Sequence, residues 1–220
     1  MKSINTLDNL IVLFSIILFT YIFIQSNFLS YKEKLNQRHQ LILLGDSILE
    51  NSNYVEKYFS VESKIKEKHK FVFNLAQDNA TIQDLKPQIV RLKQKKINEN
   101  DVIFISIGGN DILNEYRFKK KNNKIHLNDI FNRYISTISK IKSQFTNKII
   151  LINIYSPPNV KEFHPLIKIW NNKQKKFAQE NNIKMLDINS LFTDKKFFIK
   201  NIEPSNDGSR IIANAIVNSI

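Results

Sequence analysis

The 220-residue sequence contains no cysteine, only four glycines and only five prolines. The absence of cysteine excludes disulfide bonds, a thiol nucleophile, thiolate metal sites and lipid attachment to an amino-terminal cysteine. The four histidines are scattered and show no metal-ligand spacing, so we expect no metal and no cofactor. Because glycine is so scarce, its positions are informative: three of the four are Gly45, Gly108 and Gly109.

Arginine is also scarce: it supplies five of the 33 basic residues of a chain whose net charge is +13. Nucleic-acid binding favours basic side chains that are focused on one face, rich in arginine and interleaved with aromatic residues. Here the lysines fall into short runs that are typical of solvated surfaces, at 66–70, 93–96, 119–124 and 173–176. The pattern argues against a nucleic-acid partner and is more compatible with attraction to an anionic membrane surface.

Charged residues are absent from Asn9 to Tyr31, and Leu10–Ile24 ("LIVLFSIILFTYIFI") is almost wholly apolar. This run is long enough to cross a bilayer as a tilted helix. We therefore interpret residues 1–31 as an uncleaved membrane anchor. A cleaved signal peptide is the alternative, but no A-x-A-like site follows the run.

The charges that flank this segment bear on its orientation. Lys32, Lys34 and Arg38 follow it, and by the positive-inside rule they favour a cytoplasmic location for the rest of the chain. The function inferred below favours the opposite, outward orientation.

The remaining chain, at 40–220, has the length of one domain and alternates strand and helix patterns. Short apolar runs predict five strands, at 41–44, 71–75, 102–107, 148–154 and 184–188. Helical spacing predicts helices at 54–65, 81–97, 127–145, 166–181 and 211–220, the second of which contains Pro87. This alternation predicts an α/β fold with a five-stranded parallel sheet covered on both faces.

Polar residues follow the first three predicted strands. Ser47 follows the first, Asn79 the second, and Gly108-Gly109-Asn110-Asp111 the third. In open parallel sheets ligands bind beyond the carboxyl ends of the strands. We therefore expect these residues to meet at one edge of the sheet. Each also has a local explanation, because serine caps helices and Gly, Asn and Asp dominate turns.

Four segments together resemble the SGNH (GDSL-type) hydrolase family. Gly45-Asp46-Ser47-Ile48 resembles its first motif, residues 74–81 ("NLAQDNAT") its second, Gly108-Gly109-Asn110-Asp111 its third and residues 200–216 ("KNIEPSNDGSRIIANAI") its closing motif. The resemblance extends over residues 40–220. It implies a three-layer flavodoxin-like fold and a reaction of ester hydrolysis or acyl transfer.

By the same resemblance, Ser47 is the nucleophile. The oxyanion hole consists of the backbone N–H groups of Ser47 and Asn79 and the side-chain amide of Asn110. The family usually has glycine where Asn79 stands, and asparagine tolerates left-handed backbone better than most residues. Asp46 braces the turn, and Gly45, Gly109 and Asp111 support it.

The closing motif departs from the family at two positions. Glu203 occupies the position of the catalytic histidine, and Lys200 that of the aspartate three residues earlier. If burial raises the pKa of Glu203, it is a usable general base, whereas an ion pair with Lys200 would lower that pKa. Two other bases stay open, because His126 and His164 follow the third and fourth strands. The other two histidines, His39 and His69, precede strands and so fall at the wrong edge.

Two functions remain open from the sequence. The first is a membrane-anchored ester hydrolase or acyltransferase that acts on an acyl or acetyl ester of a lipid or cell-envelope glycan. Such substrates favour a domain that faces outward, in the periplasm or outside the cell. The alternative is a domain that has lost its base and binds an acylated glycan, lipid or protein partner.

Overall fold

The computed structural model describes residues 6–36, 39–119 and 126–220. The chain divides into two compact units, Met1–Arg38 and His39–Ile220, which are described separately. The first five residues of the predicted anchor and most of the lysine run at 119–124 lie outside the described residues.

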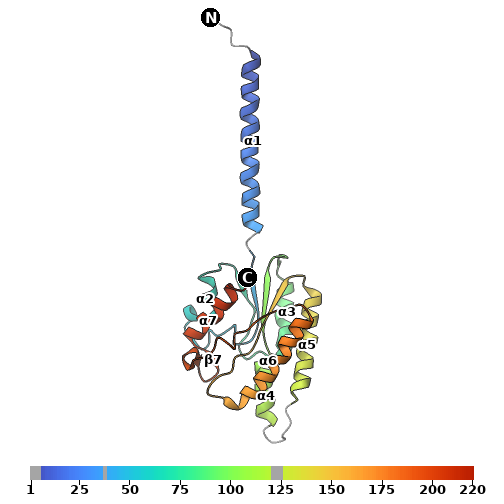
Figure 1. Cartoon of the computed structure of the whole chain (residues 1–220), viewed down its shortest axis with the longest axis vertical. Helices are drawn as coiled ribbons and strands as arrows, with labels where there is room; N and C mark the ends of the chain where they lie inside the picture. The colour runs from blue at the N-terminus through green and yellow to red at the C-terminus, as the bar shows by residue number, and fades with distance from the viewer. Residues whose placement is uncertain (1–5, 37–38, 120–125) are drawn as a thin grey trace. The chain divides into compact units, whose positions relative to one another are not determined.

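The first unit contains one long helix, α1 (Thr6–Asn36; Figure 1). Its most apolar window is Ile11–Phe28, 18 residues with a mean hydropathy of 1.9 and no buried residue. At 1.5 Å per residue this window is about 27 Å long, close to the ~30 Å hydrocarbon core of a bilayer. The prediction of one amino-terminal apolar helix is confirmed; its length and composition suit a membrane span and a signal sequence equally.

The second unit is built on a five-stranded parallel sheet with the strand order β2-β1-β3-β4-β5. The strands are β1 (Leu41–Gly45), β2 (Val72–Asn74), β3 (Val102–Ser106), β4 (Lys148–Ile152) and β5 (Lys184–Leu186). Leu41 of β1 pairs with Val72 on one side and Val102 on the other, so β1 is internal. This order is the flavodoxin-like one, in which the strand order reverses between β1 and β3, and it confirms the predicted fold class.

Helices cover both faces of the sheet. Ile42 and Leu44 of β1 belong to one core, and Leu41 and Leu43 belong to the other. The first core packs under α3 (Leu85–Lys93), α5 (Leu127–Gln144) and α6 (His164–Glu180). The second packs under α2 (Val61–Lys66) and α7 (Asn206–Val217), on the opposite side in Figure 1. Burial on both faces explains why the strands are continuous apolar runs rather than alternating ones.

Two predicted helices are shorter than their apolar pattern. In the predicted helix 54–65, the 3₁₀ turn η1 (Lys57–Phe59) comes first, and Ser60 caps the start of α2 by accepting from the Ser63 N–H. The predicted helix 81–97 is a 3₁₀ turn, η2 (Ile82–Asp84), followed by α3. Pro87 lies in the first turn of α3, where its missing N–H is not needed.

One helix, a short hairpin and two 3₁₀ turns have no counterpart in the sequence prediction. The helix α4 (Gly109–Lys119) begins inside the Gly108–Asp111 motif, so this segment is a helix start rather than an ordinary turn. An antiparallel hairpin pairs β6 (Phe198–Ile199) with β7 (Glu203–Pro204), two strands that are too short to show a period. Two further 3₁₀ turns are η3 (Lys161–Phe163) and η4 (Lys195–Phe197).

The pair of glycines before α4 gives a test of this local packing. Gly108 has φ +112°, and an added Cβ would lie 2.3 Å from the Trp170 ring, whereas a Cβ on Gly109 would meet nothing closer than 3.8 Å. We expect Gly108→Ala to lower the free energy of unfolding by about 3 kcal/mol, through backbone strain and overpacking. Gly109→Ala is the matched control and should change it by less than about 0.5 kcal/mol. Urea denaturation followed by far-UV circular dichroism measures both, and equal stabilities would contradict the packing described.

Candidate active site

Ser47 lies in a tight turn at the carboxyl end of β1. Gly45 has φ +135°, and the Asp46 N–H donates to the Ser106 carbonyl of β3 over 3.1 Å. One helical turn follows, closed by N–H groups of Leu49 and Glu50 that both donate to the Asp46 carbonyl over 3.0 Å. The Ser47 N–H donates to no other described residue, so it is free to bind a ligand atom.

A fully buried glutamine holds this turn from the neighbouring helix. Gln88 of α3 accepts from the Gly45 N–H over 2.7 Å and donates to the Gly45 carbonyl over 2.9 Å. Both backbone groups of Gly45 are thereby satisfied inside the protein. The sequence prediction missed Gln88, although a polar residue on the apolar stripe formed by Leu85, Ile89 and Leu92 is a signal that points to it.

Asn79 and Asn110 come together as predicted. Asn79 has φ +61°, the left-handed conformation expected where the family has glycine. The Asn110 side-chain amide donates to the Ala80 carbonyl over 2.9 Å, and the Asp111 carboxylate accepts from the Ile82 N–H over 2.9 Å. The start of α4 therefore fixes the loop after β2. One N–H of the Asn110 amide remains available, as does the Asn79 backbone N–H.

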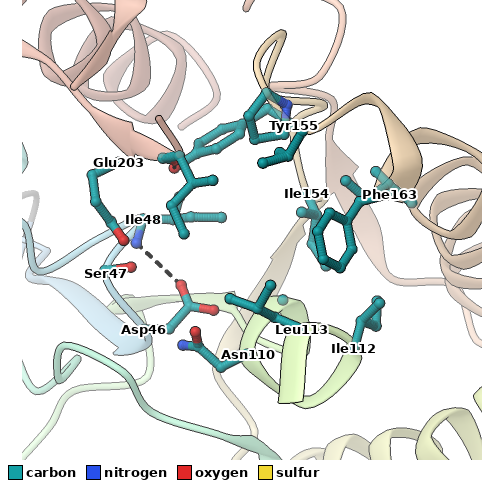
Figure 2. Close-up of a pocket in the computed structure, with 15 residues that line it drawn as sticks. Asp46, Ser47, Ile48, Asn110, Ile112, Leu113, Ile154, Tyr155, Phe163 and Glu203 are labelled. Atoms are coloured by element: carbon teal, nitrogen blue, oxygen red, sulfur yellow. Dashed lines mark hydrogen bonds between the residues drawn. The ribbon is translucent and has the colours of Figure 1, made fainter. Parts of the chain in front are cut away.

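Glu203, the first residue of β7, is 7% exposed, and its carboxyl group points toward the Ser47 hydroxyl (Figure 2). Its Oε2 atom is buried and has no hydrogen-bond partner among the described residues. Two buried side chains hold the hairpin here. Asn51 donates to the Pro204 carbonyl over 3.2 Å, and the Tyr155 hydroxyl donates to the Ile202 carbonyl over 2.9 Å.

Three buried carboxyl groups, those of Asp46, Asp111 and Glu203, dominate the electrostatics of the site. Burial raises the pKa of Asp46 to about 8, and the nearby charges of Glu203 and Asp111 act in the same direction. Burial also raises the pKa values of Asp111 and Glu203 above their ordinary range. For Glu203, the Ser47 hydroxyl and the Lys200 charge oppose this rise, and the Asp78 charge adds to it.

Lys200 and Glu203 do not form the ion pair that the sequence left open. Among the described ion pairs within 4.0 Å, none involves Lys200. Its ammonium group lies 5.0 Å from the centroid of the Tyr54 ring instead. Burial, rather than a lysine partner, therefore sets the direction of the pKa of Glu203.

The site residues line two adjoining hollows. The first, of about 600 Å³ including space open to solvent, holds Asp46, Ser47, Asn110 and Glu203 on one side. Figure 2 shows its other side, which is apolar and formed by Ile112, Leu113, Ile154 and Phe163. The second hollow, of about 620 Å³, is polar and is lined by Tyr54, Asn79, Asn110, Leu113, Asn114, Arg117, Lys200, Ile202 and Glu203. Asn110 and Glu203 stand at the junction, since they line both hollows.

None of the four histidines lines either hollow. His164 lies in the first turn of α6, with Nε2 2.7 Å from the Pro157 carbonyl oxygen, so it supports the wall of the apolar hollow. His126 is exposed beside Asp129. His39 and His69 pack against each other before β1 and β2, at the opposite edge of the sheet, as expected.

The raised pKa of Asp46 makes stability depend on pH. Between about 3.8 and about 8 the folded chain keeps a proton on Asp46 that the unfolded chain releases. The contribution of Asp46 to the free energy of unfolding is therefore fully present below this range. It is lost as pH rises through the range, by up to about 1.4 kcal/mol per pH unit. Asp46→Asn should make this decline shallower, while Asp111 and Glu203 keep part of it.

The measurement is urea denaturation of the full chain in detergent between pH 5 and 8. It is followed by the fluorescence of Trp170, the single tryptophan, which is buried in the second unit. Glu99→Gln removes an exposed carboxylate, and its free energy of unfolding should change with pH as steeply as that of wild type. Identical slopes in wild type and Asp46→Asn would mean that Asp46 is ionised in the folded protein.

Comparison with known proteins agrees with this geometry. Residues 41–216 match the family described as GDSL-like lipase/acylhydrolase. No curated protein matches the sequence significantly.

Solved structures share the fold at low sequence identity. A lipolytic G-D-S-L family protein from Veillonella parvula superposes with a TM-score of 0.67 and 18% identity over 82% of this chain and 97% of its own. The lipase/acylhydrolase from Enterococcus faecalis has a TM-score of 0.60 and 18% identity, over 83% of this chain and 95% of its own. A catalytic mutant of an acetylxylan esterase from Geobacillus stearothermophilus has a TM-score of 0.61 and 17% identity, over 82% of this chain and 93% of its own.

The family match covers most of the chain and includes all four motifs. The chain belongs to the GDSL-like lipase/acylhydrolase (SGNH) family.

Proposed function

We propose that the chain is a membrane-anchored serine esterase or acyltransferase that acts on an acyl or acetyl ester of a lipid or cell-envelope glycan. One observation carries the proposal: Ser47 and a buried Glu203 face each other beside free N–H donors, where the strand order reverses between β1 and β3. A binding domain has no need for a serine aligned with a carboxylate and an oxyanion site.

In the first step the Ser47 Oγ atom attacks the ester carbonyl carbon while Glu203 takes the hydroxyl proton. The carbonyl oxygen becomes an oxyanion, which accepts hydrogen bonds from the Ser47 and Asn79 N–H groups and from the Asn110 amide. The contact between Asn110 and the Ala80 carbonyl orients that amide before substrate arrives.

In the second step the protonated Glu203 gives its proton to the alcohol oxygen as the carbon–oxygen bond breaks, which leaves an acyl group on Ser47. Water, or a second alcohol in a transferase, then attacks the acyl carbon. Glu203 takes the proton of this nucleophile, and Ser47 leaves with a proton restored. Hydrolysis and transfer differ only in that last nucleophile.

The environment of Glu203 suits a general base. An ordinary glutamate, with a pKa of about 4.3, is a weak base at neutral pH, and histidine is better matched to the task. Burial raises the pKa of Glu203 toward the working range, and the free Oε2 atom leaves room to accept a proton. These features support Glu203 in the role that histidine has in the family.

The helix α1 supports the anchor. Two of its polar side chains form hydrogen bonds within the helix: the Ser15 hydroxyl donates to the Ile11 carbonyl, and the Thr20 hydroxyl donates to the Ile17 carbonyl. Local pairing of this kind lowers the cost of polar groups in lipid. An anchor would hold the esterase near lipid and envelope substrates, so we propose that the domain faces outward.

Labelling with a fluorophosphonate probe, which phosphonylates activated serines, tests the site. Wild-type full chain in detergent should be labelled, and Ser47→Ala should not be labelled at all. Glu203→Gln should be labelled at least about 10²-fold more slowly, because the base is lost. His164→Ala is the matched control and should label within about twofold of wild type.

The pH dependence of labelling separates the roles further. A base works only when deprotonated, so the wild-type rate should fall as pH drops through the pKa of Glu203, which burial raises above its ordinary value. Glu203→Gln should lose that dependence. A folded wild type that is not labelled at any pH would sink the esterase proposal and favour the binding alternative.

Protease treatment of intact cells that express the chain tests the anchor and its orientation. We expect the full-length chain in the carbonate-washed membrane fraction, and we expect added protease to degrade its second unit while a cytoplasmic marker survives. A soluble chain whose mass lacks α1 would identify a cleaved signal sequence instead. A membrane-bound chain that resists protease until the cells are lysed would place the domain inside.

A further inference from the structure

The polar hollow beside Ser47 carries two unpaired cations. Lys200 and Arg117 both line it, and neither has an ion-pair partner within 4.0 Å among the described residues. Both side chains are exposed at the rim of the hollow, where solvent rather than a carboxylate surrounds them. Here the positive ends stay available to a ligand.

Among the described residues, no carboxyl group forms an ion pair with either cation within 4.0 Å. Asp78 is occupied, since it accepts from the Tyr54 hydroxyl over 2.7 Å and from the Asn53 amide over 3.2 Å. Glu162 lines a neighbouring hollow that Arg117 and Lys200 also line, but pairs with neither. Asp111 is engaged with the Ile82 N–H.

The backbone at Lys200 is strained. Lys200 and Asn201 have φ +47° and +75°, in the turn that joins β6 to β7. Glycine, asparagine and aspartate are the residues that usually adopt positive φ, and lysine has no intrinsic preference for this conformation. A strained residue retained at a site points to a function for its side chain. The stack of the Lys200 ammonium on Tyr54 directs that side chain to the hollow.

The two hollows divide the substrate at the ester. Ser47 lines only the apolar hollow and Asn79 only the polar one, so the reacting carbon lies at their junction. An apolar acyl group fits among Ile112, Ile154 and Phe163. The alcohol then extends into the polar hollow, past the Glu203 carboxyl that protonates its leaving oxygen.

We infer that Lys200 and Arg117 form an anion subsite for the alcohol part of the ester, so that the preferred substrates carry a phosphate or carboxylate there. This inference rests on the proposed esterase function and narrows its substrate class. Two partly solvated cations supply modest attraction, about tenfold in kcat/KM, which salt weakens.

The test uses three water-soluble esters with the same acyl group: butyryl glycerol, butyryl glycerol 3-phosphate and the butyryl ester of glyceric acid. The full chain in detergent should prefer the anionic esters about tenfold in kcat/KM. Lys200→Asn and Arg117→Gln should each lower this ratio, and the double variant should bring it near one. Lys140→Gln removes a charge outside both hollows and should keep the wild-type ratio.

A lower preference for anionic esters in Lys200→Asn would not come from misfolding. Asparagine relieves the strained turn, so its urea midpoint should equal or exceed that of wild type. The ranking of the two anionic esters identifies whether the subsite favours phosphate or carboxylate. If the glycerol esters are not turned over, their inhibition of 4-nitrophenyl butyrate hydrolysis gives the same comparison.

The controls separate the two proposals. One outcome is that the wild type hydrolyses 4-nitrophenyl butyrate but shows no preference for anionic over neutral esters, as substrates or as inhibitors. That result would overturn the anion subsite and leave the esterase proposal intact. Failure to hydrolyse any ester, together with no fluorophosphonate labelling, overturns both.

Discussion

The close approach of β1 and β3 at Gly45 is the constraint on which the site depends. A Cβ at this position would lie 1.8 Å from the Ser106 carbonyl oxygen, so only glycine lets the two strand ends meet. The Asp46 N–H then reaches that same oxygen, and Gln88 satisfies both backbone groups of Gly45. This contact places the Ser47 turn beside the start of α4, where Asn110 lies. A wider gap between the strands would separate Ser47 from Asn110.

A second set of buried contacts brings the carboxyl-terminal hairpin to that turn. Asn51 links the segment after Ser47 to Pro204, and Tyr155, in the loop after β4, holds Ile202. Glu203 lies between these two anchored residues, so its position does not require a partner for its own carboxyl group. The carboxyl group therefore stays buried beside the Ser47 hydroxyl, and burial raises its pKa above the ordinary range.

Sequence patterns predicted the sheet, the covered faces and the meeting of Ser47, Asn79 and Asn110, because continuous apolar strands and strand-end motifs are local signals. They did not predict α4, since Gly108-Gly109-Asn110-Asp111 has the composition of a turn although a helix begins there. The β6–β7 hairpin was also missed, because two-residue strands show no period. Asn51 lies in a polar run, and only the tertiary contact with Pro204 distinguishes it from a surface residue.

The two departures from the family motif make sense together. The resemblance places an aspartate and a histidine where Lys200 and Glu203 stand, and an aspartate there would orient the histidine. Glutamate needs no such partner, because β7 and its neighbours already hold it and either carboxylate oxygen accepts a proton. The earlier position is then released from that role, and a lysine there turns toward Tyr54 and the polar hollow. Under the proposed function, a glutamate base leaves the earlier position free to contact the substrate, and that position carries a positive charge where the family motif has a negative one.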